Sequence, residues 1–155
     1  MIRRAIIDDL PSIVRMSEDF LQASPYNSSP YARNFLTQNI QGMLINPMFV
    51  IFVAEDHSGN LVGMLAGVLT TRIFSPAPTA GELVWWVDPE ARQNGVGVEL
   101  HTAFEAWAKN KGALSCSMVL LQDENEELID KMYKTMGYNP TERSYFKWLQ
   151  SPQSL

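Results

Sequence analysis

An arginine and two glycines stand immediately ahead of a predicted helix, in the stretch VDPEARQNGVGVEL of residues 87–100. Because glycine has no Cβ, main-chain N–H groups near Gly95 and Gly97 can approach a large anion closely. The unsatisfied donors at the amino end of a helix point the same way and carry a positive partial charge. Arg92 adds a planar, permanently charged fork that suits phosphate oxygens. The residues therefore indicate a phosphate site, or else a tight strand-to-helix turn that uses glycine for geometry alone.

The two common nucleotide-binding patterns are absent from this stretch. A dinucleotide fingerprint needs a third glycine three residues after Gly97, and Leu100 stands there. A phosphate loop of the nucleotidase kind needs Gly-Lys followed by Ser or Thr, which the sequence lacks. A phosphate-bearing ligand of another class is therefore expected.

The same stretch resembles the acetyl-coenzyme A signature of the GCN5-related N-acetyltransferases (the GNAT family), which reads Arg or Gln, two residues, Gly, one residue, and Gly or Ala. Arg92, Gly95 and Gly97 fill this pattern. A second stretch, MYKTMGY of residues 132–138, resembles another motif of the family, a Tyr followed four residues later by Gly and an aromatic residue. The order of the predicted elements also matches the family across residues 2–149, so the resemblance covers nearly the whole chain.

The resemblance implies acetyl-CoA as the cosubstrate, with no metal. The fourth strand near Trp86 and Val87 would pair with the pantetheine like an added strand, and an N–H near Val87 would polarise the thioester carbonyl. The family commonly has an Asn seven residues before its tyrosine. Glu126 stands there and Asn125 precedes it, so either Asn125 takes this role from a slightly different helix start or the contact is missing. The N–H groups expected to hold the diphosphate are those of Gln93, Asn94, Gly95, Val96, Gly97 and Val98.

Two side chains are expected to move protons. Tyr133 matches the position where the family often has a tyrosine that protonates the leaving thiolate, which suits a phenol of pKa about 10; the alternative is a tyrosine packed under the sheet. Glu82 starts the fourth strand, where several family members carry the general base, and the alternative is a solvated carboxylate. Alternation places Glu82 on one face with Val84 and Trp86, unless the bulge that the resemblance implies intervenes.

The acceptor is expected between residues 22–31, residues 72–81 and the carboxyl-terminal strands. Polyamines, amino acids, peptide termini, lysines and aminoglycosides all remain compatible with the sequence. The prediction is a single acetyltransferase domain, residues 1–155, that transfers acetyl directly from acetyl-CoA to a primary amine of a small molecule or peptide. The alternatives are a non-catalytic coenzyme A-binding or regulatory module and a structural or interaction protein. The aromatic residues that either line an apolar acceptor pocket or belong to the core are Tyr26, Tyr31, Phe74 and Trp86.

The elements that must position these residues follow from apolar periodicity, turn residues and glycine stops. They predict an α/β (α+β) fold, and the resemblance specifies a mixed, mostly antiparallel sheet of six to seven strands with four helices, splayed between the fourth and fifth strands. Strands are expected over 1–7, 48–56, 61–74, 81–87 and 113–121, helices over 8–23, 31–46, 95–112 and 123–137, and a closing hairpin or strand pair over 138–149.

Composition and charge limit the partners and the cellular location that can be expected. The net charge of −5 and the pI of about 5.0 disfavour nucleic acid as a partner. The single cysteine, Cys116, indicates a reducing compartment, and no apolar run is long enough for a membrane span, so a cytoplasmic location without membrane partners is expected. Cys116 is interpreted as an inert thiol and His101 as a surface or partly buried helix residue, neither of them catalytic. A homodimer through strand edges is a further expectation.

Overall fold

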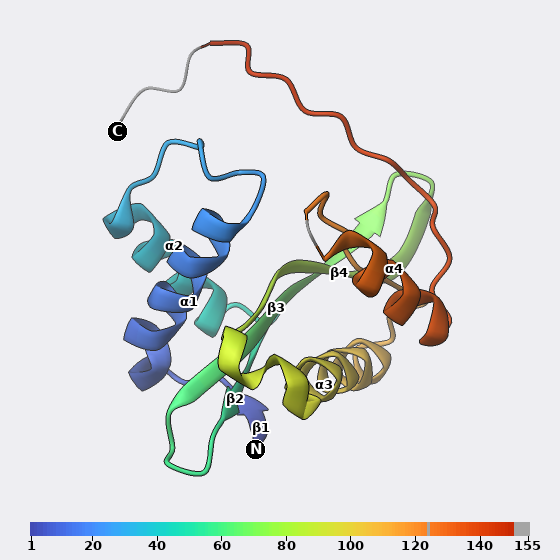
Figure 1. Cartoon of the computed structure of the whole chain (residues 1–155). Helices are drawn as coiled ribbons and strands as arrows, with labels where there is room; N and C mark the ends of the chain where they lie inside the picture. The colour runs from blue at the N-terminus through green and yellow to red at the C-terminus, as the bar shows by residue number, and fades with distance from the viewer. Residues whose placement is uncertain (124, 151–155) are drawn as a thin grey trace.

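A single mixed sheet with helices on both faces forms the protein, as the computed structural model of residues 1–123 and 125–150 shows (Figure 1). The mixed α/β class and the four α-helices are therefore confirmed for the described part of the chain. The strands are β1 (Ile2–Arg4), β2 (Phe49–Glu55), β3 (Leu61–Arg72), β4 (Ser75–Val87) and β5 (Ser115–Ser117). The helices are α1 (Leu10–Ala23), α2 (Arg33–Ile45), α3 (Val96–Asn110) and α4 (Glu126–Thr135), with short 3-10 helices η1 (Ile7–Asp9) and η2 (Pro89–Asn94).

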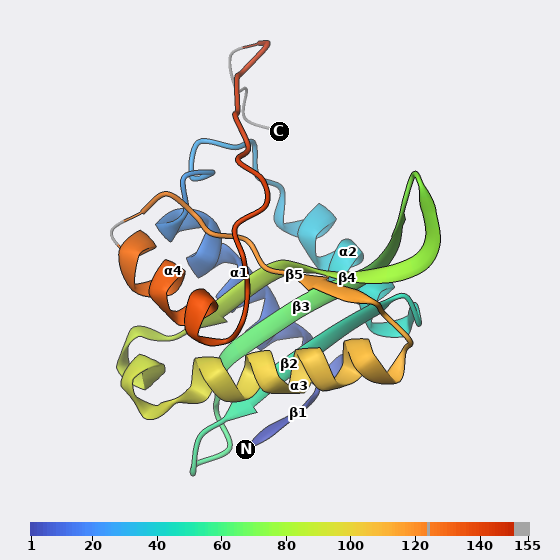
Figure 2. The ribbon, with the colours of Figure 1, turned by 90° about the vertical axis from the view of Figure 1, so that its right-hand side faces the viewer.

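The strands lie in the order β1-β2-β3-β4-β5. The first four strands pair in antiparallel fashion, and β5 alone runs parallel to its neighbour β4. A parallel pair needs a crossover, and α3 supplies it. In Figure 2, α3 and α4 lie on the face toward the viewer, and α1 and α2 lie behind the sheet.

Both faces of the central strands are apolar because helices cover both faces. Along β2, Val50 and Phe52 pack toward α3, whereas Ile51 and Val53 pack toward α1 and α2. This alternation explains the uninterrupted apolar run that predicted the strand over 48–56. The helical side chains that complete these two clusters include Leu100, Phe104 and Trp107 from α3, and Ile13, Val14 and Ile40 from α1 and α2.

The hairpin of β3 and β4 is longer than the sequence predicted. Residues 75–80, which lie between the strands predicted over 61–74 and 81–87, instead belong to β4, and Pro78 pairs with Thr71 of β3. Prolines are tolerated here because β4 is an edge strand up to Thr79, where its pairing with β5 begins.

A bulge at Leu83 interrupts the pairing of β3 with β4. Ala66 pairs with Val84 and Gly67 with Glu82, so Leu83 is the extra residue. The bulge implied by the resemblance is thus present. It places Glu82 on the α3 face, opposite to Val84, so strict alternation gives the wrong face for this carboxylate.

The sheet has five strands among the described residues, so the prediction of six to seven strands is wrong. The predicted strand over 113–121 shortens to β5, and residues 138–149 form no strand. These residues run as an extended arc past the β3–β4 hairpin, where Glu142 lies 4.0 Å from Arg72 (Figure 1). With only three paired residues, β5 offers them too short an edge to extend the sheet.

Candidate active site

The centre of the candidate site is the divergence of β4 from β5. The two strands pair at Thr79, Ala80 and Gly81, and no pairing continues beyond Gly81 although β4 runs on to Val87. The predicted splay between these strands is therefore confirmed. Among the described residues, one edge of β4 therefore has no strand neighbour from Glu82 onward.

Glu82 and Tyr133 meet at the main chain of Val119, shortly after β5. The N–H of Val119 donates to Glu82 Oε2 at 2.8 Å, and Tyr133 Oη donates to the carbonyl of Val119 at 2.9 Å. One side chain comes from β4 and the other from α4. The structure therefore brings together the two side chains that the sequence selected for proton transfer.

Burial shifts the titration of both groups. It raises the pKa of Glu82 to about 7, against the opposing effect of the hydrogen bond from the Val119 N–H. Burial, followed by the nearby charge of Glu82, also raises the pKa of Tyr133. Near neutral pH, Glu82 thus has the proton affinity that suits a general base, and Tyr133 remains a neutral phenol with a proton to donate.

The start of α3 presents main-chain donors to solvent. Gly95 adopts φ 75°, and the first α-helical bond runs from the N–H of Glu99 to the carbonyl of Gly95 at 3.1 Å. The N–H groups of the three residues between Gly95 and Glu99 therefore have no carbonyl acceptor within the helix. The flanking side chains are exposed from Arg92 to Gly95 and again at Val98. The donors left open in this way belong to Val96, Gly97 and Val98.

The main chain of Val87 faces the unpaired edge of β4. Asp88 donates its N–H to Val62 of β3 at 2.8 Å, and successive peptide groups along a strand alternate in direction. The N–H and C=O of Val87 therefore point away from β3. The carbonyl accepts Arg92 Nε at 3.0 Å, while the Arg92 guanidinium carbon lies 5.0 Å from the centre of the Trp86 ring. Arg92 is thus fixed to the end of β4.

Trp85 and Trp86 lie on opposite faces of β4. Trp86 packs toward α1 and donates Nε1 to Asp88 at 2.8 Å. Trp85 stacks on Tyr133 with ring centres 6.1 Å apart, and a Cβ placed on Gly97 would lie 3.2 Å from its Cζ2 atom. Gly97 therefore lets the start of α3 pack closely against Trp85. Trp85 Nε1 is buried without an acceptor among the described residues, as expected beside a site for an oxygen-rich ligand.

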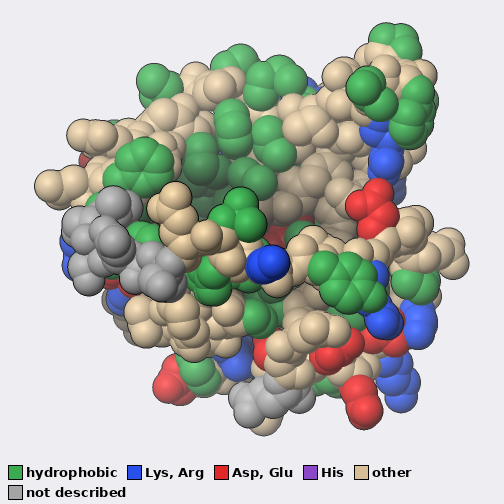
Figure 3. Space-filling model, turned by 90° about the horizontal axis from the view of Figure 1, so that it is seen from above, with side chains coloured by type: hydrophobic (Ala, Val, Ile, Leu, Met, Phe, Trp, Pro, Cys, Tyr) green, Lys and Arg blue, Asp and Glu red, His purple; other side chains and the backbone are tan. Residues whose placement is uncertain are grey.

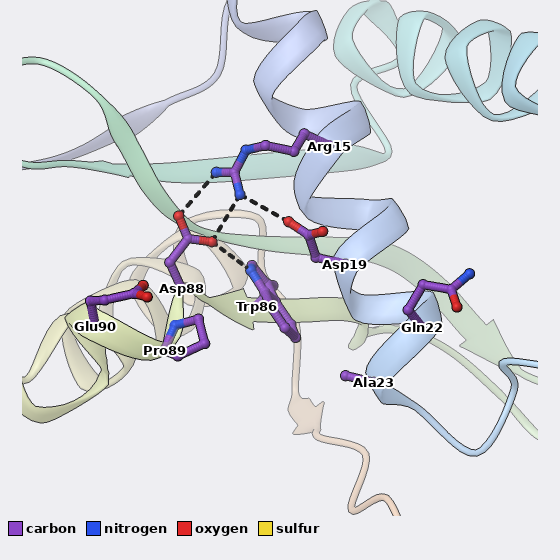
Figure 4. A pocket seen from close by; sticks show the side chains of 8 residues that line it. All are labelled: Arg15, Asp19, Gln22, Ala23, Trp86, Asp88, Pro89 and Glu90. Atoms are coloured by element: carbon purple, nitrogen blue, oxygen red, sulfur yellow. Dashed lines mark hydrogen bonds and ion pairs between the residues drawn. The ribbon is translucent and has the colours of Figure 1, made fainter.

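A cleft of about 560 Å³ lies between α1 and the end of β4 (Figure 4). This volume is in the range of small-molecule sites. The face seen from above in Figure 3 is hollowed near its middle, where hydrophobic side chains gather. The residues that line the cleft are Arg15, Asp19, Gln22, Ala23, Trp86, Asp88, Pro89 and Glu90.

Asp88 holds the wall of this cleft together. Its carboxylate accepts two hydrogen bonds from Arg15, each of 3.0 Å, and one from Trp86 (Figure 4). We expect Asp88→Ala to lower the free energy of unfolding by about 1–2 kcal/mol, a modest effect because solvent screens the half-exposed Arg15. Urea unfolding measures this change. The control, Asp19→Ala, removes only the exposed partner of Arg15, and an equal loss in both variants would contradict this role of Asp88.

Several predicted residues lie apart from this centre. Asn125 lies just before α4, and Glu126 is the first residue of that helix. Among the described residues, neither side chain makes a hydrogen bond that links it to Glu82 or Tyr133. Tyr26 and Tyr31 are partly exposed on the loop between α1 and α2, and Phe74 is 80% exposed at the tip of the β3–β4 hairpin. Of the four aromatic residues proposed for an acceptor pocket, Trp86 alone lines the cleft.

Sequence reasoning missed a buried polar cluster beside Tyr133. His101, interpreted as a surface or partly buried residue, is only 3% exposed, and its Nε2 lies 2.9 Å from Tyr138 Oη. Tyr138 Oη in turn donates to Glu105 Oε1 at 2.9 Å. The spacing of His101 and Glu105, one helical turn apart, was the available signal, but nothing local pointed to Tyr138 as their partner.

Two further properties concern the described part of the chain. Residues 1–123 and 125–150 contain no group of three or more His, Cys, Asp or Glu side chains arranged to hold a metal ion. No helix in these ranges combines the length and apolar character needed to cross a membrane.

A family model described as the acetyltransferase (GNAT) family matches residues 12–138. No curated protein sequence matches the chain. Many solved structures do, and three share 18% identity with it. An aminoglycoside antibiotic 6'-N-acetyltransferase from Acinetobacter baumannii has a TM-score of 0.74, with 96% of this chain and 97% of that chain covered. An aminoglycoside N-acetyltransferase in complex with CoA has a TM-score of 0.76, with 96% and 93% covered. A transcriptional regulator from Bacillus halodurans has a TM-score of 0.78, with 96% and 99% covered.

Proposed function

Because the chain belongs to the acetyltransferase (GNAT) family, we propose that it transfers acetyl from acetyl-CoA directly to a primary amine of a small molecule or peptide. The observation that carries this proposal is the meeting of Glu82 and Tyr133 at Val119, inside the splay between β4 and β5. A base with a pKa of about 7 and a neutral phenol held on one residue form a pair that can accept one proton and donate another.

The start of α3 fits the coenzyme. The open N–H groups of Val96, Gly97 and Val98 suit a diphosphate, because they combine hydrogen bonds with the positive end of the helix. Arg92, held at the end of β4, adds positive charge nearby. Gln93 and Asn94 lie in η2 and Gly95 joins η2 to α3, so these three residues flank the proposed diphosphate site. The buried, unpaired Nε1 of Trp85 lies on the same side of β4 and would gain an acceptor from the ligand.

The chain's own groups carry out positioning and proton transfer. Acetyl-CoA supplies the acetyl group as a reactive thioester. The Val87 N–H points to the free edge of β4, where it can donate to the thioester oxygen as negative charge develops there. Glu82 accepts the proton of the attacking amine, and Tyr133 gives its proton to the departing sulfur. Trp86 and Val87 orient the pantetheine, with Asn125 as a further candidate contact near α4.

The acceptor is proposed to reach Glu82 through the splay between β4 and β5, because the cleft between α1 and β4 lies beside Trp86 on the opposite face of the sheet. Because aminoglycoside acetyltransferases are among the proteins that share this fold, amino sugars are the first class to test, followed by polyamines, amino acids and peptides. A homodimer and a cytoplasmic location stay predictions.

A free-thiol release assay with acetyl-CoA and this panel of amines tests the proposal. We expect thiol release that depends on the amine and produces an equal amount of acetylated product, identified by mass spectrometry. Binding of acetyl-CoA without release for any class of amine would favour the alternative, a coenzyme-binding regulatory module. The similarity of this fold to that of a transcriptional regulator supports testing this alternative.

The variant Tyr133→Phe tests whether Tyr133 acts as an acid in the reaction or only packs against Trp85. The phenylalanine ring keeps the stack on Trp85 but loses the hydroxyl that binds Val119. We expect kcat to fall by about 10²-fold, because the departing thiolate loses its acid, while the Kd for acetyl-CoA stays within about twofold. Steady-state kinetics and calorimetry measure the two quantities. An unchanged kcat would remove Tyr133 from the mechanism.

A further inference from the structure

We propose that His101, Tyr138 and Glu105 form a positioning relay that fixes the hydroxyl of Tyr133 from α3. This inference rests on the proposed function, since it concerns how the acid of that reaction is held. It deepens the account of the site, because these three side chains carry no role in the mechanism above.

The directions of the hydrogen bonds in the relay follow from counting donors. Glu105 accepts and Tyr138 has a single hydroxyl proton, so the 2.9 Å bond between them uses that proton. His101 must then donate Nε2–H to Tyr138 Oη across 2.9 Å. Burial lowers the pKa of His101, which favours the neutral ring. Because Nε2 is the donor to Tyr138, the single proton of the neutral ring is on Nε2 and Nδ1 is bare. Burial likewise raises the pKa of Tyr138, which keeps its proton.

Tyr138 is joined to Tyr133 through the end of α4. Gly137 adopts φ 90°, its N–H donates to Lys134 at 3.1 Å, and the N–H of Tyr138 donates to the carbonyl of Tyr133 at 3.0 Å. These bonds form a Schellman cap, in which the residue after the glycine commonly contacts the one five positions earlier. The two tyrosine rings lie 5.7 Å apart in that arrangement. The spacing of Tyr, Gly and aromatic residue in MYKTMGY thus has a structural reason.

The relay ties this cap to α3. His101 is buried and also lies 6.2 Å from Trp85, which stacks on Tyr133. Tyr133 is therefore held from both sides, by the Trp85 ring and by the capped end of α4. Without the Tyr138 hydroxyl, α4 keeps its cap but loses its polar attachment to α3. The position of Tyr133 Oη against Val119 then becomes less defined.

A double-mutant cycle with Tyr138→Phe and Tyr133→Phe tests the relay. Tyr138→Phe keeps the ring and the cap, and we expect kcat to fall about fivefold to tenfold with the KM for acetyl-CoA within twofold. In the Tyr133→Phe background the same change should have no further effect on kcat. Equal losses in both backgrounds, or no loss in either, would overturn the relay. A wild-type kcat for Tyr133→Phe alone would overturn the proposed acid, and the relay with it.

Two measurements extend the test beyond activity. In the ligand-free protein, nitrogen NMR of His101 should show a protonated Nε2 and a bare Nδ1 at neutral pH, and Tyr138→Phe should abolish this preference. The opposite tautomer in the wild-type protein would contradict the relay. The second variant, Glu105→Ala, removes the partly exposed acceptor with little risk to folding and should reproduce the kcat loss, whereas Glu105→Gln, which keeps an acceptor oxygen, should restore most of it. Equal activity of these two variants would also contradict it.

Discussion

Replacing Glu82 with glutamine is expected to lower kcat/KM for the acceptor amine by about 10²–10⁴-fold. Glutamine keeps nearly the same shape and retains an oxygen that can accept the Val119 N–H, but it cannot take a proton from the amine. The variant should therefore fold and bind acetyl-CoA as the wild type does. The matched control is Glu127→Gln, which removes an equal charge from an exposed position on α4 and should change kcat/KM less than twofold.

The pH dependence identifies the same group independently. Because burial raises the pKa of Glu82 to about 7, kcat/KM for one amine should fall as the pH drops below 7 in the wild type. This limb should be missing from Glu82→Gln. If the limb persists in the variant, another group is the base.

The shifted pKa of Glu82 affects stability and activity in opposite directions: as the pH rises, kcat/KM should increase and the stability contributed by this carboxyl should decrease. Its folded pKa lies above the ordinary value of about 4.3, so its protonation favours the folded state at low pH, and this contribution is lost as the pH rises through about 7. Between pH 5 and 8, the Tm of Glu82→Gln should therefore decline less than that of the wild type. Parallel declines would contradict the shifted pKa.

The second large effect is expected from Gly97→Val. A Cβ at this position would already lie 3.2 Å from Trp85, and the branched side chain must displace the indole or turn the first peptide groups of α3. The diphosphate then loses hydrogen bonds to charged oxygens worth about 1.5–3 kcal/mol each. Loss of one or two corresponds to a rise of about 10²-fold in the Kd for acetyl-CoA, measured by calorimetry.

Gly42→Val provides the control for this substitution. Gly42 is also a helical glycine, but it is exposed on α2 and has free space around its Cβ position. Both variants replace a helical glycine with the same β-branched residue, so they share the change in helix propensity. Only Gly97→Val should weaken the coenzyme. An affinity within threefold of the wild type would show that the start of α3 does not hold it.

The features that sequence could predict depend on short segments of chain. The glycines of residues 87–100 reveal the start of α3 because the open N–H donors and the positive φ of Gly95 are set within one turn. The spacing of Tyr133 and Gly137 is likewise local, since it belongs to one helix cap. The apolar run over 48–56 predicts a strand, and the structure confirms it as β2.

The features that sequence could not predict depend on partners far along the chain. The bulge at Leu83 is defined by its pairing with β3, and it decides which face Glu82 occupies. Residues 75–80 become strand despite two prolines because an edge is available there. Residues 138–149 have strand-like residues but form no strand. His101 joins a buried polar cluster only because Tyr138, 37 residues later in the chain, lies within hydrogen-bond distance of it.

The central claim is that main-chain donors at the start of α3 bind the diphosphate of the coenzyme. Its most direct test is calorimetric titration of the wild-type protein with acetyl-CoA and with acetyl-pantetheine, which carries the same thioester but lacks the diphosphate and the adenosine 3′-phosphate attached to it. We predict binding of acetyl-CoA with a Kd in the range of about 1 μM to 1 mM, and binding of acetyl-pantetheine at least about 10²-fold weaker. Equal affinities for the two compounds, or no heat with acetyl-CoA at millimolar concentration, would contradict the account.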